Sequence, residues 1–323
     1  MADQTEPDQT EPDATGSTFK PWITEPGVYD LPAETYHRDP VVGGSLSNTG
    51  AKKLLTPNCP AIFKAWIDGR GEPETKKEFD FGRAAHRHVL SAGDDTVVIA
   101  GDGADENAWR TKSDKARVAE VRAAGKTPVK PNQVEQIEEM AAAIRANTTA
   151  AALLDPASGK AEQTLVMRDP KTGVWCRALV DWLRHPEPAG RLLLVDYKTA
   201  AEVDPESIAK AIASYGYFKQ GPWYMECAEQ LGLSAVEPAF LFIFQRKTAP
   251  YLVTVTQLTP EDVARGREAA AGARELYAWC RRTGRWPGYG DEVLSVPMAF
   301  WARTQHDEAA AAGAFHAPEE IPA

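Results

Sequence analysis

The middle of the chain carries three consecutive apolar segments that are separated by short stretches of turn-forming residues. The apolar segments are 161–168, 174–184 and 192–199, and the stretches between them read DPKTG and HPEPAG. Proline, glycine and aspartate favour tight turns, so the three segments are expected to be consecutive strands. Short connections of this kind join antiparallel neighbours, which means that the chain must fold around a sheet with an antiparallel part.

Segments with helical periodicity lie on both sides of these strands in the sequence. Helices are expected at 47–55, 59–68, 79–90, 105–124, 132–147, 205–231 and 260–282. The stretch GKTPVKP is expected to be a turn, and residues 239–246 and 251–256 are expected to form a hairpin. The predicted fold is therefore α/β, with a central mixed or antiparallel sheet flanked by helices and a helical N-terminal part.

Both ends of the chain are acidic and of low complexity. Residues 1–18 contain the repeat DQTEP–DQTEP, and residues 304–323 are rich in alanine and acids, so both are expected to be disordered tails. Residues 19–303 are expected to form a single domain. Its helical part would cover about 45–155 and its sheet-centred part about 160–285.

The composition favours a soluble cytoplasmic protein without a membrane segment. No apolar run reaches about 18 residues, and the N-terminus is acidic where a secretory signal would be basic and then apolar. The cysteines contain no CxxC pair, so neither a zinc knuckle nor a disulfide framework is indicated. They are also too widely spaced for an iron–sulfur cluster, and reduced thiols are expected at Cys59, Cys176, Cys227 and Cys280.

The net charge of −10 looks unfavourable for binding nucleic acid, which depends on Lys and Arg neutralising phosphates. However, five acids lie before Lys20 and four lie after Arg303, so the body of the chain is close to neutral. Within the body, residues 110–130 contain seven Lys and Arg against two acids. This segment predicts a local basic surface; the alternative interpretation is a solvated amphipathic helix that Trp109 anchors.

Two acids and a lysine are expected to meet on the central strands. Alternate strand residues share a face, so Asp196 and Lys198 in LLLVDYKT lie on one side of the sheet. A hairpin that is symmetric about residues 188 and 189 places Asp181 directly opposite Asp196. Opposed like charges destabilise a sheet, and a bound Mg²⁺ or Mn²⁺ would remove that conflict. The alternative is a pair of strand-end acids with Lys198 as their solvated partner.

Three further elements accompany these acids. His86 follows Gly82 by one helical turn in FGRAAH, and the glycine leaves room for a strand or a DNA backbone. Glu162 is expected to lie beside the acid of the next strand, although an exposed strand-end acid is an equal alternative. Gln220 and Tyr224 in KQGPWY lie one turn apart, either presenting an amide and a phenol to a phosphate or forming a partly buried helix seam.

This ordered set resembles the RecB-type branch of the PD-(D/E)XK nucleases. The motifs that carry the resemblance are GxxxH, a strand glutamate, the acid in CRALVDWL, D-x-K and QxxxY. The segment DENAWRTK with the following basic helix and GKTPV, and the run from GVYDLPAETYH to VPMAFW, are similar to the exodeoxyribonuclease VIII (RecE-type) nuclease domain of phages and prophages. The resemblance covers roughly residues 27–301, and one departure is Arg177, where the family often has glycine.

The resemblance implies a role for each matched residue. The expected ligands of Mg²⁺, for which Mn²⁺ can substitute, are Asp181, Asp196, His86 and the main-chain carbonyl of Tyr197. Lys198 would position or activate the water, and Glu162 would support a second metal or its waters. The residues expected to contact DNA are Gln220, Tyr224, Arg83, Trp109, Arg110 and Lys112.

The resemblance also implies an activity, a partner and an assembly. The activity would be 5′→3′ digestion of linear double-stranded DNA from its ends, leaving 3′ single strands for a RecT-type annealing protein in phage-type recombination. Relatives form rings around DNA, so a homo-oligomeric ring is expected, in the bacterial host cytoplasm if a phage encodes the protein. The alternatives are a structure-specific or single-strand nuclease in repair or defence, a non-catalytic DNA-binding recombination partner, and a hydrolase of another substrate.

Overall fold

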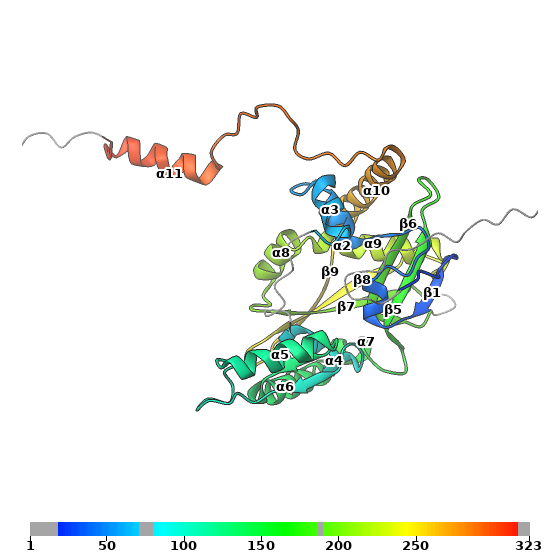
Figure 1. Cartoon of the computed structure of the whole chain (residues 1–323), viewed down its shortest axis with the longest axis vertical. Coiled ribbons are helices and arrows are strands. Elements are labelled where there is room, and N and C mark those ends of the chain that lie inside the picture. The colour runs from blue at the N-terminus through cyan, green and yellow to red at the C-terminus, as the bar shows by residue number, and fades with distance from the viewer. Residues whose placement is uncertain (1–18, 71–79, 187–189, 316–323) are drawn as a thin grey trace, which may run out of the picture. The chain divides into compact units, whose positions relative to one another are not determined.

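The computed structural model describes residues 19–70, 80–186 and 190–315 of the chain, which divide into two units. The first unit, up to Gly288, is built on a mixed sheet in which seven strands are described (Figure 1). Their bounds are β1 Gly27–Asp30, β2 Leu46–Ser47, β5 Gly159–Arg168, β6 Trp175–Arg184, β7 Leu193–Ala200, β8 Ala239–Arg246 and β9 Val253–Gln257. The order is β1-β5-β6-β7-β8-β9, and β2 pairs with β6.

The centre of the sheet is the antiparallel meander that the turn-rich connections predict. β5, β6 and β7 pair antiparallel, β7 pairs parallel with β8, and β8 pairs antiparallel with β9. The parallel step between β7 and β8 is possible because two helices lie between them in the sequence. These are α8 Pro205–Ser214 and α9 Tyr217–Gln230. The expected α/β fold with a central mixed sheet flanked by helices is confirmed.

Helices cover both faces of this sheet (Figure 1). The larger core cluster lies under α2 Asn48–Leu54, α3 Pro60–Ile67, α8, α9 and α10 Pro260–Thr283. The second cluster joins Trp182, Val195, Tyr197 and Ile243 of the sheet to α4 Asp80–Leu90, α6 Pro131–Ala146 and α7 Thr148–Leu153. The strands are therefore buried on both sides, as their nearly continuous apolar sequences require. All four cysteines are buried free thiols.

Two expected elements have different bounds in the structure. The helix expected at 105–124 begins only with α5 Lys112–Ala123, because the Thr111 side chain and Asp114 form a capping box that fixes its start. The turn expected in GKTPVKP contains β4 Thr127–Val129, which pairs parallel with β3 Thr96–Val98. Strands as short as these have too few residues to show a periodic pattern, and the short helix α1 Ala33–His37 was likewise not expected.

The single helix expected at 205–231 is two helices. The chain breaks at Gly216, whose φ of 65° lies in the left-handed region that glycine adopts without strain. Pro222 does not break the second helix; it is the sixth residue of α9. This break turns α9 so that its buried side, from Gln220 to Met225, faces the sheet.

The second unit, from Tyr289 on, contains α11 Phe300–Ala311. The alanines of α11 have a high helix propensity and none of its residues is buried, so a loose tail from residue 304 stays a prediction. The boundary between the two units, at Gly288, falls inside the single domain that is expected for 19–303. The expected disorder of residues 1–18 lies outside the described residues. No described helix is both long enough and apolar enough to cross a membrane.

Candidate active site

The acids of the central strands lie where β6 and β7 separate. The two described pairs of this ladder, Trp182 with Val195 and Leu183 with Leu194, have the register expected from the symmetric hairpin. That register brings Asp181 and Asp196 to the next position, beyond the last paired residues. There the Tyr197 backbone N–H donates to Asp181 Oδ2 at 3.0 Å instead of to the opposite strand. The carboxylates thus occupy a fork in the sheet.

Asp196 lies at the bottom of this fork and is only 1% exposed. Lys198 Nζ lies 2.6 Å from Asp196 Oδ2, so the expected shared face of these two residues is confirmed. On its other oxygen, Asp196 Oδ1 accepts a hydrogen bond of 2.6 Å from Gln220 Nε2 of α9. The Lys198 ammonium also lies 5.3 Å from the centre of the Tyr217 ring. The face of the sheet under α9 therefore holds one carboxylate between an amide and a cation.

His86 reaches the same fork from α4, which packs on the opposite face of the sheet. His86 Nε2 lies 3.2 Å from Asp181 Oδ2, and His86 Nδ1 lies 3.6 Å from Glu162 Oε1. A Cβ added at Gly82 would lie 3.4 Å from Thr199 Oγ1, which is an ordinary van der Waals contact, so α4 lies against β7 at this glycine. The sequence allowed a strand or a DNA backbone beside this glycine, and in the structure the neighbour is strand β7.

Glu162 has an unusual backbone at the site. Its neighbours Ala161 and Gln163 pair with Trp182 and Val180, which places Glu162 across from Asp181 as expected. Its φ is 51°, in the left-handed region, where a residue with a Cβ loses about 1–2 kcal/mol. This conformation accompanies a carboxylate that is turned toward His86. Backbone strain of this kind persists where the surroundings hold it, and it is typical of functional sites.

The four charged groups of the fork shift one another's pKa values. Burial, and then repulsion by Asp181, raise the pKa of Asp196 to about 6. Burial alone would also raise the pKa of Asp181, but the His86 imidazole holds it below its usual value. Burial would lower the pKa of both His86 and Lys198, and the acids beside them raise it instead. The pKa values of the two facing carboxylates are thus shifted in opposite directions, as expected for acids whose titrations are coupled.

The donor atoms in the fork fit a divalent metal ion in kind. Two carboxylates and an imidazole are common metal ligands, and Asp196 Oδ2 is buried without a well-aligned hydrogen bond from a described residue, although Lys198 lies nearby. No three His, Cys, Asp or Glu side chains within 19–70, 80–186 and 190–315 converge as metal ligands do. Lys198 and His86 supply the positive charge that the acids require.

The structure places the residues expected to contact DNA in three different surroundings. Gln220 and Tyr224 are buried: the Gln220 amide donates to Asp196, and Tyr224 packs edge-on against Phe240 at 5.5 Å, while their contact with DNA stays a prediction. The seam interpretation of these two residues is the one the structure supports. Arg83, Arg110 and Lys112 are exposed, whereas Trp109 is half-buried and lines a cavity beside α4 and α5. Among the described residues, no hydrogen bond or ion pair joins these four to the fork.

Two residues near the site were missed or undervalued from the sequence. Arg177 is buried and forms an ion pair of 2.9 Å with Asp39, while its carbonyl accepts from Trp223 Nε1 at 3.1 Å. It thereby ties the strand of Asp181 to α9. Gly93, with a φ of 102°, lies so close that a Cβ there would be 3.4 Å from Glu162 Oε1. Only a three-dimensional arrangement could reveal this glycine, because nothing in its local sequence marks it.

Comparison with known proteins places this geometry in context. A family model described as "PDDEXK-like domain of unknown function (DUF3799)" matches residues 47–296, a range that includes every residue of the fork. A crystal structure of a "Putative exonuclease" from Eubacterium rectale is similar, with a TM-score of 0.53 and 14% sequence identity. The similarity covers 85% of this chain and 98% of the other, and at this identity it shows a shared fold alone. None of the curated proteins matches the sequence.

Proposed function

The chain belongs to the PDDEXK-like domain family DUF3799, and from this premise we propose that it is a metal-dependent deoxyribonuclease. One observation carries the proposal: Asp181 and Asp196 meet in the fork of a buried sheet, with Lys198 Nζ 2.6 Å from Asp196. Opposed acids in such a position are unfavourable for folding, so they call for a function. Acids, lysine and histidine in this order are the set that phosphodiester hydrolysis uses.

The proposed roles follow from the contacts of each side chain. Asp181, Asp196 and His86 would hold Mg²⁺, or Mn²⁺ in its place, with the Tyr197 carbonyl as a further donor. The ion would stabilise negative charge that develops on the phosphate. Lys198 would orient the attacking water or the phosphate with its positive charge. Gln220 fixes Asp196 through its amide, and Glu162 faces the second nitrogen of His86 and would support the ion's waters.

We further propose that the enzyme is a RecE-type exonuclease that digests linear double-stranded DNA 5′→3′. The order and spacing of the motifs support this branch, and the protein of similar fold from Eubacterium rectale is named only as a "Putative exonuclease". The remaining 3′ single strand would be the substrate of a RecT-type annealing protein in recombination. A homo-oligomeric ring would enclose the DNA. The chain between its acidic ends is nearly neutral, and a ring would still bind DNA because only the surface of its channel must be basic.

The test is digestion of an end-labelled linear duplex with Mg²⁺ by the wild type, Asp196→Ala and Lys198→Ala. Removing the lysine is expected to lower kcat by about 10²–10³-fold, and removing the carboxylate is expected to abolish digestion. Lys210→Ala is the matched control, since Lys210 is exposed on α8 and its ion-pair partner among the described residues is Glu206. Full activity in either site variant, with a normally folded protein, would refute the proposal.

Two further measurements separate the alternatives. A covalently closed circular duplex should stay intact, because an exonuclease needs an end; its degradation would favour a structure-specific nuclease. Mg²⁺ or Mn²⁺ should raise the thermal stability of the wild type and leave that of Asp196→Ala unchanged. A binding protein with remnant acids would show no such stabilisation in either form.

A further inference from the structure

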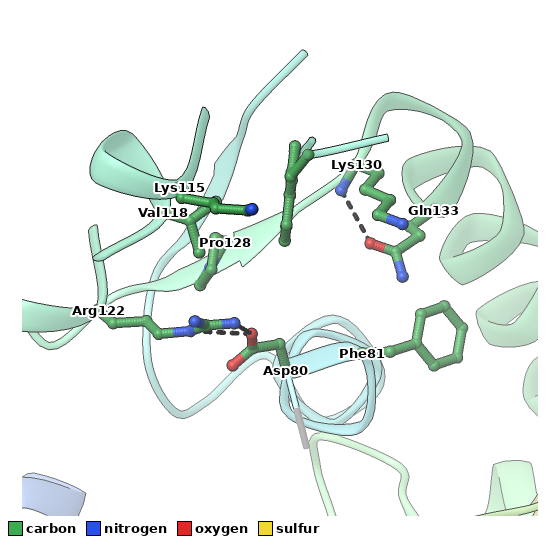
Figure 2. Close-up of a pocket in the computed structure, with 9 residues that line it drawn as sticks. Asp80, Phe81, Lys115, Val118, Arg122, Pro128, Lys130 and Gln133 are labelled. Atoms are coloured by element: carbon green, nitrogen blue, oxygen red, sulfur yellow. Dashed lines mark hydrogen bonds and ion pairs between the residues drawn. The ribbon is translucent and has the colours of Figure 1, made fainter. Parts of the chain in front are cut away.

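A cavity of about 470 Å³ lies beside the start of α4, away from the acids of the fork. Phe81 of α4, Trp109 and the side of α5 form its apolar wall. Figure 2 shows Lys115 and Arg122 of α5 entering from one side and Lys130 and Gln133 from the other. The cavity thus combines two aromatic rings with three cationic side chains. This composition suits a ligand that has both a flat apolar part and a negative charge.

The charges around this cavity are unbalanced. Arg122 is committed to Asp80, to which it donates two hydrogen bonds, from Nε at 3.1 Å and from Nη2 at 2.5 Å. Lys115 and Lys130 form no ion pair with any acid in the described part of the chain. Lys130 instead lies 5.5 Å from the centre of the Trp109 ring. Two ammonium groups are therefore available to an anion beside an aromatic surface.

The aromatic wall is held in place before any ligand binds. Trp109 Nε1 donates to the Ile99 carbonyl at 2.9 Å. The segment that carries Trp109 is fixed by the buried Asp114, whose carboxylate accepts from the backbone N–H groups of Asp102, Arg110 and Thr111. A rigid ring binds a flat partner without a large loss of conformational entropy. The cavity is thus preorganised for stacking.

We propose that this cavity binds one nucleotide, with the base stacked on Trp109 and the phosphate held by Lys115 and Lys130. Bases stack favourably on aromatic side chains, and ammonium groups form charge-assisted hydrogen bonds with phosphate. The amide of Gln133 supplies a donor for the edge of the base. Asp80 Oδ1 supplies an acceptor, since it is buried without a hydrogen-bond partner among the described residues.

This inference rests on the proposed nuclease function for the source of the nucleotide. Phe81 and His86 lie on the same helix, five residues apart, which is about 8 Å along the helix axis. A strand with about 3.4 Å of rise per stacked nucleotide covers that distance in about two nucleotides. Five residues also turn about 140° around the axis, so a strand whose scissile phosphate lies at the acids would have to pass around α4 and place a nucleotide further along in the cavity. A free mononucleotide, the product of digestion, has the same chemistry.

The first test is calorimetric titration of the full chain with dAMP, deoxyadenosine and inorganic phosphate, in EDTA so that no metal contributes. We expect dAMP to bind more tightly than either fragment. Lys115→Ala and Trp109→Ala should each weaken dAMP binding at least about tenfold, which is about 1.4 kcal/mol. Trp109→Phe keeps a ring and should retain most of the affinity. Lys126→Ala, at an exposed lysine just after α5, is the matched control and should bind like the wild type.

The second test repeats the titration with a 5′-phosphorylated oligodeoxynucleotide. Tighter binding than dAMP, with the same loss in Lys115→Ala, would identify the DNA strand as the occupant; weaker binding would identify the free mononucleotide. Inorganic phosphate binding as tightly as dAMP, or unchanged affinities in both variants, would overturn the proposal. Failure of the nuclease assignment is a separate result, because Asp196→Ala should abolish digestion while its affinity for dAMP stays unchanged.

Discussion

Helix α10 lies against α9 with almost no space between their backbones at Gly266. A Cβ added there would lie 2.1 Å from the Phe218 carbonyl oxygen and 2.5 Å from Pro222 Cγ. Neither atom can move aside easily, because one belongs to the backbone and the other to a ring within α9. Gly266→Ala must therefore push the two helices apart and disturb the packing of Ala270 and Ala273, which are buried on the same helix.

The size and sign of the effect can be worked out from this geometry. Overpacking costs about 1–3 kcal/mol, and replacing glycine by alanine inside a helix returns up to about 1 kcal/mol. Because the clash is with backbone, we expect a net loss of roughly 2 kcal/mol and a Tm lower by roughly 4–8 °C. Gly272→Ala is the matched control on the same helix, since a Cβ there meets no atom within 4 Å. It should stabilise the protein by about 0.5–1 kcal/mol.

The assay is urea unfolding of both variants and the wild type, followed by tryptophan fluorescence and by circular dichroism. The two alanines should shift the free energy of unfolding in opposite directions. If both variants are equally stable, or if Gly266→Ala is the more stable one, the close contact between α9 and α10 does not limit the fold. DNA digestion should also fall in Gly266→Ala alone, because α9 presents Gln220 to Asp196.

Three further predictions concern the site and the segment that carries the cavity. Gln220→Ala should lower DNA digestion by about 10–100-fold while the protein stays folded, whereas Gln230→Ala, at the exposed end of α9, should change nothing. Glu162→Gly and Glu162→Ala both lose the carboxylate, but the glycine variant should be more stable to urea by about 1 kcal/mol, because alanine keeps the cost of the left-handed backbone; equal stabilities would exclude strain there. Backbone N–H groups, first that of Asp102, hold the pKa of Asp114 well below its usual value. The ionised Asp114 carboxylate therefore stabilises the folded protein fully at pH values above that usual pKa, and this stabilisation is lost in acid as the pH falls toward the pKa of the folded state. Urea unfolding should therefore show the wild type more stable than Asp114→Asn at pH 7, with a difference that begins to shrink only below about pH 4.

The meeting of the two acids was predictable because strand geometry leaves little freedom. Once HPEPAG is taken as a symmetric connection, the register follows, and a slip by one residue would turn every side chain to the other face. The pairing of Trp182 with Val195 has that register. The same period of two places Lys198 beside Asp196. These inferences need only local rules, so they could be made without any knowledge of tertiary packing.

The expectations that were wrong depended on single residues or on packing. The helix at 205–231 is interrupted by one left-handed glycine, Gly216, and the helix at 105–124 is shortened by one capping box at Thr111. Gln220 was placed correctly on a helical turn, but its direction depends on how α9 meets the sheet. Helix α9 lies close to strand β8 at Gly221, where an added Cβ would lie 3.3 Å from the side chains of Phe240 and Leu258. A sequence pattern cannot show such a contact between distant segments.

The fork also explains why residues on both faces of the sheet matter to one site. If the ladder of β6 and β7 continued past Trp182, the Tyr197 N–H would bind the opposite strand and not the Asp181 carboxylate. The described ladder ends before the two acids, and this leaves the Tyr197 N–H free to bind Asp181. Each acid is then held by a different layer: His86 of α4 reaches Asp181 from one face, and Gln220 of α9 reaches Asp196 from the other. Substitutions that loosen either helix should consequently reduce the same activity, even where they touch neither carboxylate.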